Sequence, residues 1–312
     1  MASAFELILS IFLIVALGAG LGRTRLFGGD IVTALNSFVW HVAIPAYMYR
    51  TMARNELPGF GELGLVVLYY ATALTVYFGL GFTAGKLFKL KPGERPAISL
   101  SGCFANGMML GAPIIGGAFG DKALHLLFML IAFHAPIFVT TSTIWMEIER
   151  GQRISVLATV KKTAASLVRQ TPIVALLLGV VTSAVGVTIP PFFDRILATV
   201  GGAMIPLGLF AVGASLSKVE VKGDLPQAAL AMVTKLVVLP GAMFVTTTLL
   251  GVPPLWQAVA VLMAGMPTGV VAFNFAAANQ LAPRRIATAF LLANIVAVAT
   301  LTLWVGWLSQ NR

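Results

Sequence analysis

Two long apolar stretches of the sequence are interrupted near their middles by proline, glycine and polar side chains. The candidate binding residues in these interruptions are Asn106, Gly107, Pro113, Pro267, Thr268, Gly269 and Asn274. Proline removes a backbone donor and clashes with the preceding turn, so such an interruption frees backbone polar groups inside a helix. A helix that restarts after the break carries about half a positive charge at its first turn. These residues therefore favour the binding of a small anion, and the alternative is a proline kink filled by neighbouring side chains.

Three titratable side chains also fall within apolar stretches. Lys235 lies near the middle of the stretch 225–250, where a lysine is costly unless an acceptor satisfies it. It either attracts an anion or bonds backbone carbonyls at a helix break and holds the surrounding elements together. His41 precedes Pro45, and His134 precedes another proline. Each histidine is a candidate carrier of a coupling proton, or else a structural side chain whose hydrogen bonds are satisfied.

The acidic residues and the cysteine restrict the chemistry further. All 11 Asp and Glu residues fall in connections or near the ends of apolar stretches. Their placement argues against a carboxylate-based cation site within a membrane, although backbone carbonyls at a helix break would still suit sodium. One cysteine, Cys103, and three scattered histidines give no nucleophile–base pair, cysteine metal site or disulfide within the chain. We expect no enzyme activity, metal or cofactor, and sodium or proton coupling stays open.

The composition identifies the elements that must position these residues. The chain has 312 residues, of which 58% are hydrophobic and 10% charged. Soluble domains have about 45–50% apolar and about 25% charged residues. The mean hydropathy is +0.93, which is typical of an all-α polytopic membrane protein. The net charge of +10 does not require a nucleic-acid partner, because the cations lie between apolar runs.

The apolar runs predict ten transmembrane helices, each close to the roughly 20 residues that cross a bilayer. The predicted spans are 3–22, 31–52, 63–88, 97–119, 123–146, 171–189, 192–216, 225–250, 255–280 and 285–308. The connections between them are short except for 149–170, which carries five cations. Apolar residues at helical spacing within this link predict a basic amphipathic helix on the membrane, and a solvated basic linker is the alternative. The apolar residues of the link are Ile154, Leu157, Val160, Ala164 and Leu167.

The distribution of Lys and Arg predicts the orientation. Most cations lie in the connections after the odd-numbered spans, which places the link 149–170 in the cytoplasm and both termini outside it. Ten spans around one long link also suggest a five-helix repeat at 1–148, the link at 149–170 and an inverted five-helix repeat at 171–312. Two proline pairs support the duplication: Pro45 and Pro206 are offset by 161 residues, and Pro113 and Pro267 by 154.

Three segments carry a family resemblance. Span two reads NSFVWHVAIP over residues 36–45, span four places glycine and proline five and seven residues after an asparagine, and span nine reads PTGVVAFNFA over 267–276. The matching residues include Asn36, Pro45, Asn106, Gly111, Pro113, Pro267 and Gly269. Together these segments resemble the auxin efflux carrier family, which contains bacterial carriers and the plant PIN proteins. Lys235, five residues before Pro240, is similar to a basic residue before proline in the eighth span of that family.

The resemblance implies a fold related to sodium/bile-acid carriers and sodium/proton antiporters, with two discontinuous helices crossing. It implies a scaffold of spans 1, 2, 6 and 7 and a transport domain of spans 3–5 and 8–10 that moves as an elevator. A small organic anion would bind at the crossover of spans 4 and 9, with Asn106 in direct contact and Pro113 and Pro267 marking the crossover. A homodimer through the scaffold is implied as well.

Some residues depart from the family pattern. His41 stands where an aromatic or aliphatic residue is usual, and Thr171-Pro172 where an asparagine is expected. The long central loop of many PIN proteins is missing, which favours a bacterial carrier in the inner (plasma) membrane. A dicarboxylate such as malonate or malate is then the first expected substrate, ahead of an auxin-like carboxylate. The alternatives are a sodium- or proton-coupled symporter of the bile-acid carrier type, and a membrane sensor or scaffold that transports nothing.

Overall fold

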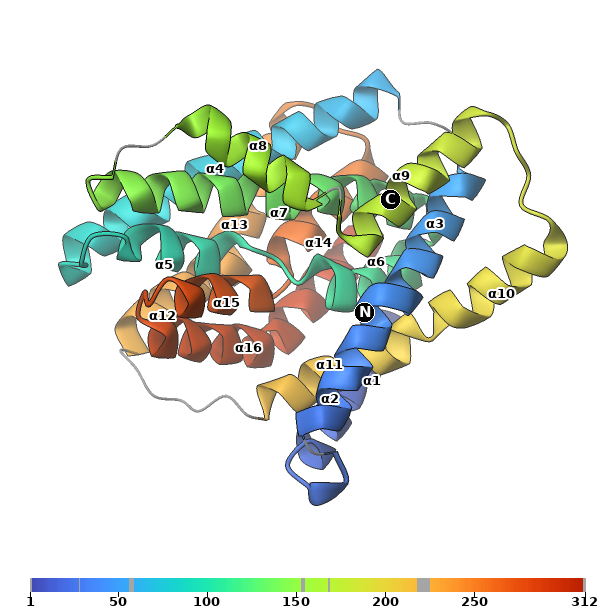
Figure 1. Cartoon of the computed structure of the whole chain (residues 1–312), viewed down its shortest axis with the longest axis horizontal. Helices are drawn as coiled ribbons and strands as arrows, with labels where there is room; N and C mark the ends of the chain where they lie inside the picture. Colours follow the sequence, from blue (N-terminus) through green and yellow to red (C-terminus); the bar gives the residue numbers. More distant parts are fainter. Residues whose placement is uncertain are drawn as a thin grey trace.

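The computed structural model describes residues 2–27, 29–55, 59–152, 155–167, 169–217 and 225–310. Within these ranges every regular element of more than one residue is a helix (Figure 1). The first part contains α1 (Ala2–Leu21), η1 (Arg25–Phe27), α2 (Gly29–Phe38), η2 (Val39–Ala43), α3 (Ile44–Arg54), α4 (Phe60–Phe88), α5 (Glu94–Cys103), η3 (Gly107–Gly111), α6 (Ala112–Phe119), α7 (Asp121–Glu149) and α8 (Val156–Leu167). The second part contains α9 (Thr171–Ala184), α10 (Pro191–Gly202), α11 (Met204–Leu216), α12 (Leu225–Val233), η4 (Thr234–Val238), α13 (Leu239–Leu249), α14 (Pro254–Gly265), α15 (Val270–Ala278) and α16 (Pro283–Gln310).

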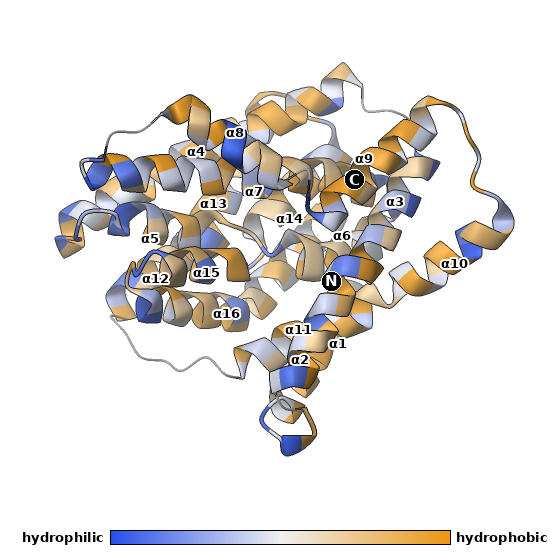
Figure 2. Ribbon diagram, in the orientation of Figure 1, coloured by the Kyte–Doolittle hydropathy of each residue, from blue (hydrophilic) through white to orange (hydrophobic). Residues whose placement is uncertain are grey.

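The helices of the described ranges make a multi-pass membrane protein. Seven are long and apolar enough to cross a bilayer, and an eighth is added if α8 and α9, bent by 78°, count as one span. The seven are Ala4–Leu21, Gly29–Arg54, Phe60–Phe88, Asp121–Glu149, Pro191–Leu216, Leu225–Leu249 and Pro283–Gln310. Hydrophobic residues predominate along these helices (Figure 2), and many of their large apolar side chains are exposed. The other predicted spans contain only shorter helices, including Gly107–Phe119 and Pro254–Gly265.

The helices pack in two groups. In the first, α1 lies along α11, and α3 lies against α9 and α10. Close backbone contact holds α1 and α11 together, since a methyl group at Gly18 or Gly213 would collide with the backbone of the other helix. Arg50 on α3 adds a two-point ion pair with Asp194 on α10, with N···O distances of 2.8 and 3.1 Å. In the second group, α4, α5, α7 and α12 to α16 pack on one another.

Three of the helical runs contain a π-helical turn that ends just before a proline. The turns η2, η3 and η4 end at residues 43, 111 and 238, and the prolines are Pro45, Pro113 and Pro240. Proline cannot donate to the preceding turn and its ring clashes with it, so the wider turn accommodates the ring without ending the helix. Pro45 and Pro240 therefore continue their helices rather than break them.

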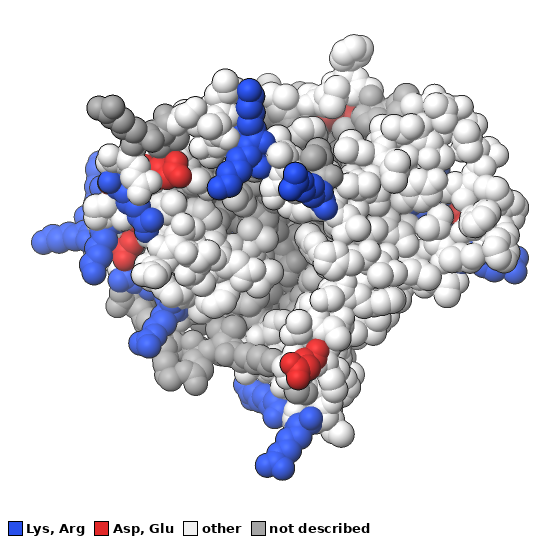
Figure 3. Space-filling model, in the orientation of Figure 1, with Lys and Arg blue, Asp and Glu red and all other residues white. Residues whose placement is uncertain are grey.

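The link between α7 and α9 contains the helix α8, which agrees with the amphipathic helix that we predicted. Arg153 and Ile154 lie outside the described residues. The apolar side chains of Val156, Leu157 and Val160 are exposed. Lys and Arg side chains gather over α8 and over the neighbouring ends of α4, α5 and α7 (Figure 3). The exposed apolar face and the cations suit a helix that rests on a membrane surface.

Candidate functional site

The two predicted helix interruptions are present and lie against each other. The chain leaves helical geometry at Phe104–Asn106, between α5 and η3, and at Met266–Gly269, between α14 and α15. Ala105 and Thr268 pair as an isolated antiparallel bridge. Two backbone bonds close this pairing: Asn106 N–H donates to the Pro267 carbonyl at 2.8 Å, and Gly269 N–H donates to the Phe104 carbonyl at 3.0 Å. The breaks satisfy part of each other's backbone, which an apolar environment demands.

The close approach of the two breaks leaves little room for a side chain at one position, Gly269. A Cβ atom at Gly269 would lie 3.0 Å from the Phe104 ring and 3.1 Å from the Ala105 carbonyl oxygen. A larger side chain would push the paired segments apart. Gly107, on the other chain segment, faces the flexible Met263 side chain, whose sulfur would lie 2.5 Å from an added Cβ.

The first break does not lie at Pro113, where the sequence placed it. Helical geometry is lost at Phe104–Asn106, seven residues earlier, and is regained through η3. Pro113 is buried near the N-terminus of α6, downstream of a π-helical turn that accommodates its ring. Pro267, in contrast, lies within the second break, and its carbonyl accepts the bond from Asn106. Pro113 therefore does not mark the crossover, whereas Pro267 does.

Buried hydrogen bonds of Thr268 stabilise the paired segments of the two breaks. Its side chain is 1% exposed, and its hydroxyl donates to the Ser101 carbonyl at 2.7 Å. The Asn294 amide lies 3.5 Å from the Thr268 carbonyl and donates to the Phe290 carbonyl at 2.8 Å. These contacts join α5, the second break and α16. They give Thr268 a structural role rather than a place on the cavity wall.

His134 binds the first break directly. The Ala105 N–H donates to Nε2 of His134 at 2.9 Å, so this nitrogen carries no proton. Nδ1 lies 3.3 Å from the Tyr70 hydroxyl, which itself donates to the Leu130 carbonyl at 2.5 Å. The ring is therefore a neutral imidazole with both nitrogens engaged. Adding a proton at Nε2 would remove the acceptor that positions Ala105.

Lys235 is fully buried in η4, which packs against both α5 and α14. Its ammonium donates to the Ala264 carbonyl at 2.5 Å, in the last turn of α14. The C-terminal end of a helix carries about half a negative charge, so the lysine compensates the end of α14 just before the second break. This contact ties η4 to the end of α14 beside the second break.

Two cavities lie beside the crossover. The larger, of about 430 Å³, is lined by Asn106, Gly107, Met108, Met109, Gly269, Val270 and Val271, together with Trp40, Met48, Phe104, Ala105, Ile131, His134, Ala135, Pro136, Val139, Gln170, Pro172, Ile173 and Met263. The first residues of both restarted helices thus line the same cavity. A smaller cavity of about 290 Å³ is lined by Asn36, Trp40, Asn106, Met109, Val212, Ser215, Val270 and Phe290. Asn106 borders both spaces.

The predicted residues are therefore only partly brought together. Asn106, Gly107, Gly269 and His134 line the larger cavity, and Asn36 lines the smaller one. The remaining candidates lie elsewhere: Pro45, Pro113, Lys235, Pro267 and Thr268 support the helices, His41 bonds the Thr171 hydroxyl at 2.8 Å on an exposed surface, and Asn274 is exposed on α15.

The sequence did not reveal part of the lining of the larger cavity. This part contains Trp40 from η2, Gln170 from the end of the link, and Pro172 and Ile173 from α9. The signal for Trp40 was available, because it falls within the NSFVWHVAIP segment. Nothing in the sequence indicated that the end of the link, at Gln170, reaches the same cavity.

Comparison with known proteins shows which family the chain belongs to. A family model described as "Membrane transport protein" matches residues 3–305. The chain belongs to the auxin efflux carrier family of membrane transport proteins. It is a transporter rather than an enzyme.

The alignments with relatives of this carrier cover almost the whole chain. An "Uncharacterized transporter" of Methanothermobacter thermautotrophicus is 25% identical, with 96% of each chain covered. A "Putative malonate transporter" of Rhizobium meliloti is 23% identical over 97% of this chain and 95% of its own. "Auxin efflux carrier component 8" of Arabidopsis thaliana is 23% identical over 88% of this chain and 89% of its own. The family resemblance seen in the sequence is thus confirmed.

Proposed function

We propose that this carrier transports a small organic anion, whose carboxylate binds between the restarted helices η3 and α15. The observation that carries the proposal is that the first residues of both helices line one cavity together with Asn106. The N–H groups of a helix's first turn have no partner within the helix and attract negative charge. The Asn106 amide supplies a further donor.

The remaining walls favour a substrate with one carboxylate and an apolar body. Trp40, Ile131, Ile173 and Met263 also line the space, and none of its described lining residues is Lys or Arg. A second carboxylate would lie against these apolar walls, and an unpaired buried charge costs several kcal/mol. An aromatic carboxylate such as indole-3-acetate therefore fits this cavity better than malonate does. Relatives bear both malonate and auxin names, so both are tested below.

The packing supports ten spans in an inverted 5+5 arrangement. In this proposal the runs α5–η3–α6 and α14–α15 each form one broken span, and α9 completes the ten. Ala105 and Thr268, which meet in the crossover, are offset by 163 residues, close to the 161 that separate Pro45 from Pro206. The repeats would be 1–148 and 171–312, joined by the link.

The position of the cavity supports an elevator mechanism. Its walls come from the first helix group, spans 1, 2, 6 and 7, and from the second group, spans 3–5 and 8–10. Sliding of the second group along the first would carry the bound anion across the bilayer. In the same proposal the scaffold forms a homodimer, the protein resides in a bacterial inner membrane, and both termini lie outside the cytoplasm.

Transport in proteoliposomes tests this function. Labelled indole-3-acetate, malonate and malate are offered to purified carrier with and without sodium and proton gradients. We expect saturable flux of indole-3-acetate with a lower KM than either dicarboxylate. Flux only under a sodium or proton gradient would favour the coupled symporter. If no organic anion moves while the vesicles remain sealed, the proposed transport of organic anions is refuted. That result would favour the sensor or scaffold alternative.

A further inference from the structure

A third cavity lies beneath the link helix α8. It has a volume of about 450 Å³ and lies between α7 and α8. Its lining residues are Ala135, Val139, Thr143, Glu147, Ala158, Thr159, Lys162, Thr163, Ser166 and Gln170. Ala135, Val139 and Gln170 also line the crossover cavity, so the two spaces adjoin at these residues.

The helix α8 exposes its apolar face, whereas a helix that packs on a protein core buries that face. Its apolar side chains Val156, Leu157 and Val160 are 54%, 64% and 44% exposed. Its polar face, with Thr159 and Lys162, turns towards α7 and the cavity. Here the apolar face is left for lipid, and the polar face lines a space suited to water and ions.

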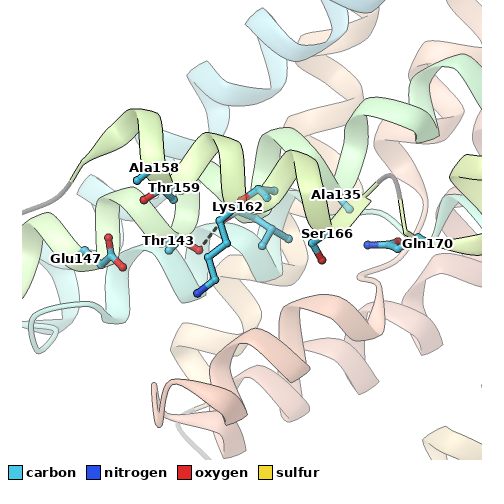
Figure 4. A pocket seen from close by; sticks show the side chains of 10 residues that line it. Ala135, Thr143, Glu147, Ala158, Thr159, Lys162, Ser166 and Gln170 are labelled. Atoms are coloured by element: carbon cyan, nitrogen blue, oxygen red, sulfur yellow. Dashed lines mark hydrogen bonds between the residues drawn. The ribbon is translucent and has the colours of Figure 1, made fainter.

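Lys162 is the cationic side chain of this space. Among the described residues that line the three adjoining cavities, it is the only Lys or Arg. Figure 4 shows its side chain reaching from α8 across the cavity, with Glu147 towards one end and Gln170 towards the other. Thr143, on the facing wall, donates its hydroxyl to the Val139 carbonyl at 2.8 Å. Glu147 opposes the lysine with a negative charge on the side away from Gln170.

We propose that the α8 cavity is an access subsite for carboxylate anions, in which Lys162 attracts the substrate before it reaches Asn106. The inference rests on the proposed function, since it supplies the route to the crossover cavity. The ordering of charges agrees with it: Lys162 lies between the outer Glu147 and the inner Gln170, at the boundary with the crossover cavity. An anion that passes Lys162 then meets the positive helix ends. The link is thus part of the transport route rather than a mere connection.

Flux measurements with matched charge variants test the subsite. Substrate is offered to the α8 side of oriented proteoliposomes, and KM and kcat are determined. Lys162→Gln should raise KM about threefold with kcat unchanged, whereas Lys162→Arg should keep the wild-type KM. Glu147→Gln should lower KM, because it removes the opposing charge. Lys161→Gln is the control, since Lys161 is exposed on α8, as Lys162 is, but does not line the cavity. Equal KM values for all variants would overturn the proposal.

Thiol labelling tests the subsite without any transport measurement. Ser166→Cys is introduced with Cys103→Ser, and the modification rates by anionic sulfonatoethyl and cationic trimethylammonioethyl methanethiosulfonate are compared. Adding Lys162→Gln should lower the anionic-to-cationic rate ratio between threefold and tenfold. An unchanged ratio would show that Lys162 sets no potential in this cavity. A lowered ratio with no anion flux would place the failure in the proposed function instead.

Discussion

Replacing Lys235 with methionine isolates what its buried ammonium contributes. Methionine keeps an unbranched apolar side chain in the space of the lysine stem, so packing changes little. It removes the donor to the Ala264 carbonyl, which lies 2.5 Å from the ammonium nitrogen. An unpaired buried carbonyl costs about 1–3 kcal/mol. Loss of the charge at the end of α14 adds about 0.3–1 kcal/mol.

The opposing effect is relief of the cost of burying an ammonium. Because helix ends rather than a carboxylate face Lys235, we expect this relief to offset only part of the loss, leaving a net destabilisation of about 2 kcal/mol. At roughly 2 °C per kcal/mol for a chain of this size, Lys235→Met should lower Tm by about 4 °C.

Thermal unfolding of the purified carrier in one detergent measures this change. Lys161→Met is the control, because Lys161 is an exposed lysine on α8. Well below Tm, the KM for anion flux should change less than threefold in Lys235→Met. An unchanged Tm accompanied by loss of substrate binding would refute the structural role and make Lys235 a ligand of the anion.

Three further variants probe the crossover itself. Asn106→Ala should keep Tm within about 2 °C and reduce kcat/KM at least tenfold. Asn274→Ala, on the exposed side of α15, should leave flux unchanged. Equal effects of the two substitutions on flux would remove Asn106 from the site. Thr268→Val removes the hydroxyl bonded to Ser101 and should destabilise by about 1–2 kcal/mol in denaturant unfolding with KM preserved, so full stability would contradict the bond. Gly269→Val should separate the paired breaks and abolish flux, and wild-type flux would show that the close approach is unnecessary.

Apolar run lengths and helix breakers predicted much of this fold. The spans around 31–52, 123–146 and 285–308 match α2–α3, α7 and α16 closely, because continuous hydrophobicity alone specifies them. Pro267 also placed the second break correctly. The first break was misplaced because the sequence does not reveal whether a proline is absorbed by a π-helical turn. At Pro113 it is, and the break falls at Phe104–Asn106 instead.

The sequence indicated the backbone features that line the crossover cavity but not the distant residues that share it. Asn106, Gly107 and Gly269 were identifiable because glycine and asparagine inside an apolar run stand out. The wall formed by Gln170 and Ile173 was not, since it depends on how the two helix groups meet. For Lys235, the sequence left two roles open, and it did not reveal that the ammonium donates to the Ala264 carbonyl.

A structure determined with a bound, bromine-labelled indole-3-acetate would test the central claim most directly. We expect its carboxylate within hydrogen-bond distance of the Asn106 side chain and the first turns of η3 and α15, with the bromine among Trp40 and Ile173. Helices that run unbroken through Ala105 and Thr268, or a ligand bound only outside the crossover cavity, would contradict the account.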